Sequence, residues 1–425
     1  MDMKSGYKKT DVGVIPEDWE LRPLGEVANV TKLAGFEYSN YFNSYNSGGT
    51  IIVIRGTNIT HNRLDLSDVK VIPRSTSLKL LRSKLFKNDL VFAYVGTIGP
   101  VYLVEENDRF HLGPNTSKIS VGDSIDSHFL FHLFTSWLIH REIVEYTSVG
   151  AQPSLSMSKI RKFKLAVPTN KTEQEAIAKA LTDTDALIES LEQLIAKKRL
   201  IKQGTMQELL TGKKRLSGFA GKWEEWTLFD VAGGRKELFD DGDWIESEHI
   251  TNEGIRLIQT GNIGVGVFLE KDDKKYICEK SFVSLRCKEI KRGDLLICRL
   301  ADPAGRSCIL PDINETKIIT SVDVTIFRPP ISVVNRVFLV NMFSTAQWFR
   351  QVADQSGGTT RKRISRGALG RIKIKLPAIG EQNGIASILT DMNTEIGILE
   401  TKVSKLRQFK QGIMQELLTG RIRLV

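Results

Sequence analysis

The sequence lacks the motifs on which most enzymes of nucleotides and nucleic acids depend. It has no Gly-x-x-x-x-Gly-Lys-Ser/Thr phosphate loop, no Asn/Asp-Pro-Pro-Tyr/Phe motif of an amino-methyltransferase and no His-Glu-x-x-His motif. Gly261, Gly264 and Gly266 do not have the spacing of a dinucleotide-binding loop. Asp302 near Arg306 could imitate a nuclease site, but a turn with a surface ion pair explains the two residues more simply. Catalytic motifs of these kinds are therefore missing from the sequence.

Metal-binding residues and long apolar runs are also scarce. The four cysteines, all in the second half, form no Cys-x-x-Cys pair and have no histidine at zinc-finger spacing: Cys278, Cys287, Cys298 and Cys308. We interpret them as core thiols of a reducing compartment rather than as metal ligands. No apolar run approaches the roughly 18 residues that span a bilayer, and the N-terminus has no secretory signal pattern. We expect a cytoplasmic protein with no membrane partner.

An internal duplication is the strongest positive feature. Residues 202–212 return as residues 410–420 with ten of eleven positions identical, both copies ending in Met-Gln-Glu-Leu-Leu-Thr-Gly. With the same offset of 208, residues 173–212 match residues 381–420 at 22 of 40 positions. Outside these segments only turn and core positions still match, such as Asn58 with Asn262. The chain is therefore two copies of a globular domain followed by a helix.

This duplication predicts four parts. Residues 1–169 and 213–377 form the globular domains, and residues 170–212 and 378–425 form the helical segments. The net charge of +10 lies almost wholly on the globular parts, at +3 and +7, while the helical segments carry −1 and +1. We expect an α+β fold: two similar mixed α/β domains separated by two long antiparallel coiled-coil helices, with pseudo-two-fold symmetry.

The globular domains show strand and helix patterns in the same order. In the first domain we expect a strand at residues 50–55, a hairpin formed by residues 90–95 and 101–104, one helix at residues 127–147 and a last strand at residues 160–167. The second domain repeats the order and has one apolar helix at residues 337–352.

The helical segments carry a heptad pattern. Apolar residues from Ile385 to Leu406 alternate in steps of four and three, and those from Ile177 to Ile195 follow the same register, with Lys198 where Leu406 stands. A helix packed on its own domain would explain a shorter stripe, but pairing of the two copies explains both stripes better. Thr172 is the expected N-cap of the first helix, and Gly212 and Gly420 are the expected C-terminal glycines.

Basic and amide side chains at matching places of the two domains are the expected DNA contacts. A basic run is usually only a solvated face, but this one recurs beside a Gly/Ser/Thr/Gln loop in both copies. Lysine and arginine neutralise phosphates, and arginine, glutamine and asparagine form paired hydrogen bonds with base edges. The expected contacts are Arg55, Asn58, Gln152, Lys159, Arg161 and Lys162 in the first domain, and Gln259, Asn262, Thr359, Thr360, Arg361, Lys362, Arg363 and Arg366 in the second.

Over nearly its whole length, the chain resembles the specificity subunits of type I restriction-modification systems. The resemblance lies in the two helices ending in Met-Gln-Glu-Leu-Leu-Thr-Gly, in the loop at residues 150–154 and in Pro16 with Trp19. Gly221-Lys222-Trp223 and the loop at residues 357–361 depart from that pattern.

The resemblance implies two target recognition domains, each reading half of a bipartite sequence in double-stranded DNA. It implies helices that set the gap and dock two modification subunits, which carry S-adenosylmethionine, and restriction subunits, which use ATP and Mg²⁺. This chain would bind no cofactor and no metal. The alternatives are a fused or stand-alone restriction or methylation enzyme with an unrecognised active site, and a helical adaptor that binds no DNA.

Overall fold

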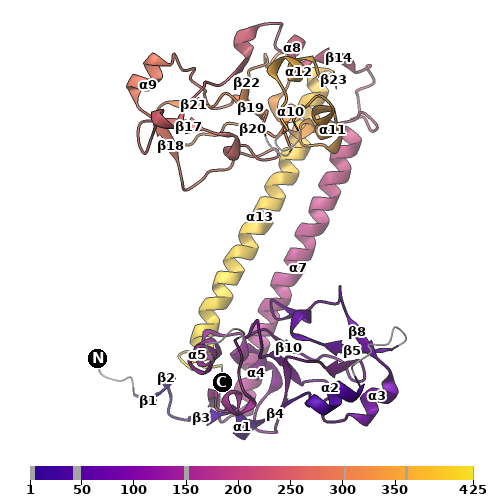
Figure 1. Ribbon diagram of the computed structural model, residues 1–425, viewed down its shortest axis with the longest axis vertical. Helices are drawn as coiled ribbons and strands as arrows, with labels where there is room; N and C mark the ends of the chain where they lie inside the picture. Colours follow the sequence, from indigo (N-terminus) through magenta and orange to yellow (C-terminus); the bar gives the residue numbers. More distant parts are fainter. Residues whose placement is uncertain (1–4, 42–48, 148–152, 301–302, 359–361, 425) are drawn as a thin grey trace. The chain divides into compact units, whose positions relative to one another are not determined.

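The computed structural model describes the chain except for residues 1–4, 42–48, 148–152, 301–302, 359–361 and 425. It divides into two compact units: Met1–Glu192 with Thr401–Val425, and Gln193–Glu400. Each unit contains one globular domain and a stretch of both long helices (Figure 1). No helix in the described ranges is long and apolar enough to cross a membrane.

The first unit is built on two sheets. One is antiparallel with the strand order β10-β9-β12-β4, and the other has the order β11-β5-β8 with β11 parallel to β5. A third pair joins β3 to β13. The strands are β1 Tyr7–Thr10, β2 Gly13–Pro16, β3 Trp19–Pro23, β4 Ala28–Lys32, β5 Ile51–Ile54, β6 Ile59–Thr60, β7 Arg63–Leu64, β8 Lys70–Ile72, β9 Leu90–Ala93, β10 Val101–Leu103, β11 Phe110–Leu112, β12 Thr116–Val121 and β13 Lys164–Pro168. The helices are α1 Leu24–Val27, α2 Gly35–Tyr41, η1 Gly56–Asn58, α3 Arg74–Lys79, α4 Ser127–Phe134, α5 Trp137–Tyr146 and α6 Met157–Ile160.

The second unit has nearly the same topology. Its sheets have the orders β15-β22-β19-β20 and β16-β18-β17-β21, again with one parallel pair, β17 with β21, and β14 pairs with β23. The strands are β14 Glu224–Thr227, β15 Phe239–Asp241, β16 Ile250–Thr251, β17 Ile255–Ile258, β18 Lys275–Ile277, β19 Leu295–Cys298, β20 Ser307–Ile309, β21 Ile318–Thr320, β22 Val324–Phe327 and β23 Lys373–Leu376. The helices are α8 Leu228–Val231, η2 Lys236–Leu238, η3 Ser247–His249, η4 Thr260–Asn262, α9 Glu279–Ser284, α10 Arg336–Met342, α11 Ala346–Asp354 and α12 Arg366–Arg371.

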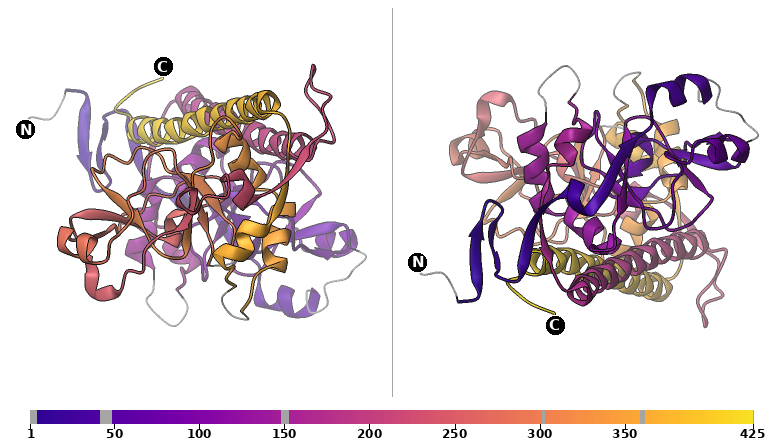
Figure 2. Two further views of the ribbon diagram at one scale, coloured as in Figure 1. Left: turned by 90° about the horizontal axis from the view of Figure 1, so that it is seen from above. Right: turned by 90° about the horizontal axis from the view of Figure 1, so that it is seen from below.

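Two long helices complete the chain, α7 Lys171–Leu209 and α13 Ile379–Leu417. In the first unit the early part of α7 contacts the late part of α13, where Asp185 pairs with Lys410 at 2.6 Å. In the second unit the late part of α7 contacts the early part of α13, where Lys198 pairs with Glu395 at 2.7 Å. The helices are therefore antiparallel and lie side by side within each unit (Figure 2), as predicted.

A repeated glutamine fastens the start of each long helix to its domain. Gln174 donates from Nε2 to the Pro168 carbonyl at 2.8 Å and accepts from the Asp126 amide at 2.8 Å. Gln382 forms the same two bonds, with the Pro377 carbonyl at 2.9 Å and the Asn335 amide at 2.9 Å. Burying an amide requires such partners, which explains why this glutamine is kept in both copies.

The C-terminal glycines behave as predicted, whereas the expected N-cap is wrong. Gly212 and Gly420 have φ angles of 71° and 67° and end their helices in the left-handed conformation. At the start of α7, Asn170 rather than Thr172 caps the helix, because its side-chain oxygen accepts from the Thr172 amide at 2.9 Å.

Two predicted helices are each broken in two. Residues 127–147 form α4 and α5, because Ser136 caps α5 and accepts from the Leu138 amide at 3.3 Å. Residues 337–352 fall in α10 and α11, where Thr345 is the new cap. The expected hairpin is confirmed: β9 and β10 pair antiparallel, with Phe92 opposite Val101.

The cysteines are reduced and mostly internal. Cys287, Cys298 and Cys308 are buried, and burial raises the pKa of Cys308 to about 12 and that of Cys287 to about 11. Cys278 is exposed and caps α9. In the described part of the chain no group of three or more His, Cys, Asp or Glu side chains is arranged to hold a metal ion.

Candidate nucleic-acid interface

A short turn after β5 and its copy after β17 hold four of the predicted contacts. Asn58 is 3% exposed and Asn262 is 4% exposed. The Asn58 side-chain oxygen accepts from the Arg55 amide at 3.2 Å, and its nitrogen donates to the Asp68 carbonyl at 2.8 Å. Asn262 repeats the pattern, accepting from the Gln259 amide and donating to the Leu269 carbonyl, both at 3.0 Å. In this structure both asparagines serve to close the turn.

The first residue of this turn differs between the copies. The Arg55 guanidinium donates to the Asp68 carbonyl at 2.6 Å and pairs with the Asp68 carboxylate at 3.0 Å. That contact holds the pKa of Asp68 below its ordinary value. Gln259 takes the equivalent position and instead lines a hollow of about 490 Å³ with Trp244, Thr260 and Lys271. The same backbone site therefore presents a guanidinium in one domain and an amide in the other.

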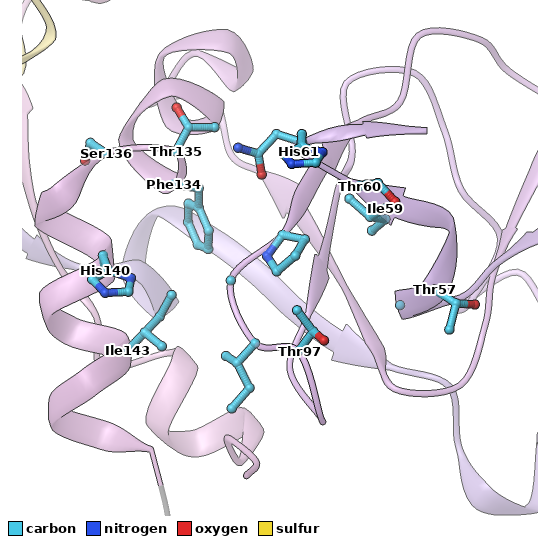
Figure 3. Close-up of a pocket in the computed structure, with 15 residues that line it drawn as sticks. Thr57, Ile59, Thr60, His61, Thr97, Phe134, Thr135, Ser136, His140 and Ile143 are labelled. Atoms are coloured by element: carbon cyan, nitrogen blue, oxygen red, sulfur yellow. The ribbon is translucent and has the colours of Figure 1, made fainter. Parts of the chain in front are cut away.

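The first domain also has a cavity beside its copy of the turn, with a volume of about 570 Å³. Figure 3 shows Thr57, Ile59, Thr60 and His61 on one side of it and Ser136, His140 and Ile143 on the other. His61 and the neighbouring Asn62 have positive φ angles of 52° and 60°. Asn62 accepts from the Val101 amide at 3.0 Å, which ties the β6–β7 turn to β10. The sequence analysis missed this cavity because its lining comes from three separate segments.

The basic segment around α6 contains the predicted cations of the first domain. Lys159 donates to the Tyr146 carbonyl at 2.8 Å, and Arg161 donates to the Val30 carbonyl at 2.6 Å. Lys162 is exposed, and its side chain forms neither a hydrogen bond nor an ion pair with any residue that the structure describes. Two of the three cations therefore help to hold the fold, and Lys162 is the one whose charge is available.

The matching segment of the second domain lies among acidic side chains. Arg363 pairs with Asp323 at 2.7 Å, and Arg366 pairs with Asp240. The Arg363 amide also donates to the Gly357 carbonyl at 2.9 Å, which closes the loop. Lys362 is exposed, and no ion pair with it occurs among the described residues. Gln152, Thr359, Thr360 and Arg361 lie outside the described residues, so their predicted roles stay predictions.

The repeated turns and hollows of the two domains define a class of protein. One mixed fold occurs twice, and the same turn borders a hollow in each copy. In the first copy the other walls are residues 97–100 and 134–143, and in the second they are residues 243–245 and 321–323 with Lys271. The constant parts are the helix anchors, and the variable parts are the hollows and basic loops. This is the organisation of a duplicated recognition protein.

Comparison with known proteins identifies the family. A family model described as the type I restriction modification DNA specificity domain matches residues 16–197 and again residues 221–408. The chain belongs to this family and carries two copies of its domain.

Similar proteins match the whole chain as well as parts of it. A Methanocaldococcus jannaschii protein provisionally named the MjaX specificity subunit of a type I restriction enzyme is 24% identical over 444 residues, covering 99% of this chain and 97% of its own. The Escherichia coli EcoBI specificity subunit is 24% identical over 183 residues, which cover 43% of this chain and 38% of its own. A crystal structure of the S subunit of a type I system from M. genitalium has a TM-score of 0.58 at 15% identity, covering 98% of both chains. At that identity the structural likeness supports the fold.

Proposed function

We propose that this chain is the specificity subunit of a type I restriction-modification complex. Residues 1–169 and 213–377 are two target recognition domains, each reading one half of a bipartite sequence in double-stranded DNA. The observation that carries this proposal is the pair of matching turns, which keep their buried asparagine but present Arg55 in one domain and Gln259 in the other. Two domains of one fold with different linings read two different half-sites.

The basic segments supply the phosphate contacts in this proposal. Lys162, just after α6, and Lys362, just before the Ser365 cap of α12, are exposed and have no acidic partner within the described ranges. The remaining predicted cations near them, Lys159, Arg161, Arg363 and Arg366, have partners inside the protein. Cations without partners neutralise phosphates at the lowest cost, because no internal ion pair has to be broken.

The helical segments 170–212 and 378–425 serve as spacer and as docking sites for two modification subunits. Their support is a set of exposed residues that are identical in both copies: Gln203 with Gln411, Gly204 with Gly412, and Gln207 with Gln415. A Cβ atom added at Gly204 or Gly412 would meet nothing within 4 Å. Exposed positions contribute nothing to the protein's own core, so a shared partner that approaches both glycines closely explains why they are kept.

The chain is non-catalytic in this proposal, and its partners supply the chemistry. S-adenosylmethionine binds the modification subunits, while ATP and Mg²⁺ act on the restriction subunits. The support is the absence of phosphate-loop and methyltransferase motifs from the sequence, together with the family to which the chain belongs. Incubating the purified chain alone with DNA, S-adenosylmethionine and Mg²⁺ tests this: methyl transfer or cutting would establish the rival enzyme function.

A domain exchange tests the reading function directly. Residues 1–169 are replaced by the first recognition domain of another family member, and the methylated sequence is determined in cells that also make the modification subunit. We expect one half-site to change while the other half-site and the gap stay the same. Changes in both half-sites would contradict the assignment of one domain to each half. Salt-sensitive, sequence-dependent DNA binding by the chain, alone or with its partners, would exclude the adaptor function, and absence of DNA binding would favour it.

A further inference from the structure

The ends of the two long helices carry the same anchoring residues. Arg215, six residues after α7, pairs with Glu381 at 2.6 Å, and Arg423, six residues after α13, pairs with Glu173. Leu210 and Leu418 are both buried in the domains that they contact. Because the arginine, the buried glutamate and the leucine are the same in both copies, these shared contacts do not distinguish α7 paired with α13 from α7 paired with a second α7.

The register between the helices is also repeated. Arg199 pairs with Glu400 at 2.6 Å in the second unit, and the equivalent residues, Arg407 and Glu192, pair at 2.6 Å in the first. A pair of two α7 helices would join Arg199 of each helix to Glu192 of the other and would keep both of these ion pairs. The choice of partner must therefore come from positions at which the two repeats differ.

One such layer contains Lys198, whose ammonium lies 2.7 Å from the Glu395 carboxylate. The offset of 208 places Leu406 and Leu187 at the equivalent positions of the first unit. The natural pairing therefore gives one layer of opposite charges and one layer of two leucines. Pairing α7 with itself would set Lys198 against Leu187 twice, and pairing α13 with itself would set Glu395 against Leu406 twice.

A second layer acts against self-pairing of the second repeat. Lys410 pairs with Asp185 at 2.6 Å in the first unit. The equivalent residues of the second unit are Lys202 and Asn393, which line one hollow of about 440 Å³, and the described residues include no ion-pair partner of Lys202. Two α13 helices would set Lys410 against Asn393 twice. A self-paired second repeat thus has no ion pair in either layer.

We propose that the layer of Lys198 and Glu395 makes each spacer helix select the helix of the other repeat, and that the two layers together exclude self-pairing of the second repeat most strongly. The partner that α13 accepts is a helix with a lysine opposite Glu395 and an aspartate opposite Lys410. Ion pairs at such partly exposed positions are individually weak. Four mismatched contacts in the self-paired second repeat together lower its population roughly tenfold relative to the natural pair. A self-paired first repeat has two mismatched contacts, Lys198 against Leu187, and sets Lys202 against Asp185 twice.

The test uses the full chain, cut after folding. A protease recognition sequence is inserted between Ser217 and Gly218, which are exposed and lie beyond Arg215, so that each fragment keeps its anchor. The cleaved protein is incubated in mild urea so that the two fragments can separate, and the urea is then removed. The complexes that form are identified by native mass spectrometry. We expect one fragment of each kind in nearly every complex, and self-pairs of the second fragment at roughly a tenth of that population or less.

A matched variant makes the two repeats equivalent in both layers. Lys198→Leu, Glu395→Leu and Asn393→Asp together place leucines and Lys–Asp pairs at every equivalent position. We expect both self-pairs to appear at near-statistical abundance. A statistical mixture from the unmodified chain, or exclusive cross-pairing of the variant, would overturn the proposal.

A measurement on the uncut chain covers the case in which the fragments do not stay folded. Lys198→Glu places two carboxylates in one layer and is expected to lower the melting temperature, while adding Glu395→Lys restores the opposite charges and the melting temperature. Failure of the second substitution to restore it would show that Lys198 and Glu395 are not coupled, and would overturn the proposal as well.

Discussion

Arg423 forms a paired contact with Glu173, which lies 250 residues earlier in the chain and has a fully buried side chain. The guanidinium donates to one carboxylate oxygen from Nη2 at 2.8 Å and to the other from Nε. Arg423 also holds Asp18 at 2.7 Å. The hydrogen bonds with Glu173 and then with Asp18 raise the pKa of Arg423, and the guanidinium lowers the pKa of Asp18. The repeat provides the same contact between Arg215 and Glu381 in the second unit, where it lowers the pKa of Glu381. Each domain is thus closed by the tail of a helix that began on the other domain.

Removing Arg423 is therefore expected to destabilise the first unit strongly. Arg423→Ala leaves the Glu173 carboxylate buried without its ion-pair partner, and losses of this kind reach about 3 kcal/mol of unfolding free energy. Urea denaturation of the full chain measures the effect.

Two further variants identify the cause. Adding Glu173→Gln to Arg423→Ala removes the uncompensated charge and is expected to recover part of the loss. Arg421→Ala is the matched control, because the ion pair that Arg421 forms among the described residues, with Glu416 at 3.4 Å, is exposed. We expect a change within about 1 kcal/mol. An equal loss in Arg421→Ala would exclude the buried pair as the explanation.

The duplication explains which features the sequence could predict. Both heptad stripes, both terminal glycines and the order of strands follow from patterns that occur twice. The breaks at Ser136 and Thr345 do not, because the apolar spacing continues across them and only the capping side chains show that a new helix begins. The burial of Asn58 could not be predicted either, because an asparagine that follows Gly-Thr is equally consistent with an exposed amide and with a buried one. The ion pair of Arg423 could not be predicted, because its partner Glu173 lies 250 residues away in the sequence.

The terminal glycines predict unequal costs of substitution. A Cβ at Gly420 would lie 2.4 Å from Pro16 Cγ, whereas at Gly212 the nearest atom is Trp223 Cε2 at 3.3 Å. Both residues have positive φ, which costs an alanine about 1–2 kcal/mol. We expect Gly212→Ala to lose about that amount and Gly420→Ala distinctly more, because Pro16 must move.

Gly218→Ala separates the two contributions. Gly218 has a φ of 86° and nothing within 4 Å of an added Cβ, so this variant reports the backbone cost alone. Unfolding free energies from urea titration rank the three variants. A loss at Gly420 no larger than that at Gly218 would contradict the close contact with Pro16.

A buried histidine predicts a dependence of stability on pH. His132 is 1% exposed, and burial lowers its pKa to about 3 from an ordinary value of 6.5. Between these two values the unfolded chain binds a proton that the folded chain does not, so stability falls as the pH falls below 6.5 and is fully present above it. The slope for one proton is about 1.4 kcal/mol per pH unit.

His132→Gln isolates this contribution. Its Nε2 lies 3.0 Å from the Thr182 hydroxyl of α7, and glutamine keeps a polar side chain there without titrating. Between pH 6 and pH 4 the variant is expected to lose about 2 kcal/mol less than the natural chain. If the unfolding free energies of the two proteins fall equally between pH 6 and pH 4, the pKa of His132 is not lowered by folding.

The spacer proposal predicts that the gap between half-sites follows helix length. Seven residues are inserted after Glu192 in α7 and seven after Glu400 in α13, which are equivalent positions at the boundary of the two units. Each unit then keeps its own ion pairs, Glu192 with Arg407 and Arg199 with Glu400, and the inserted heptads pair with each other. One heptad adds about 10.5 Å of helix, about three base pairs of DNA.

We expect the methylated sequence to keep both half-sites and to gain about three unspecified base pairs between them. Insertion into α7 alone is the control, because it shifts the register and is expected to abolish modification. An unchanged gap in the double insertion would refute the ruler.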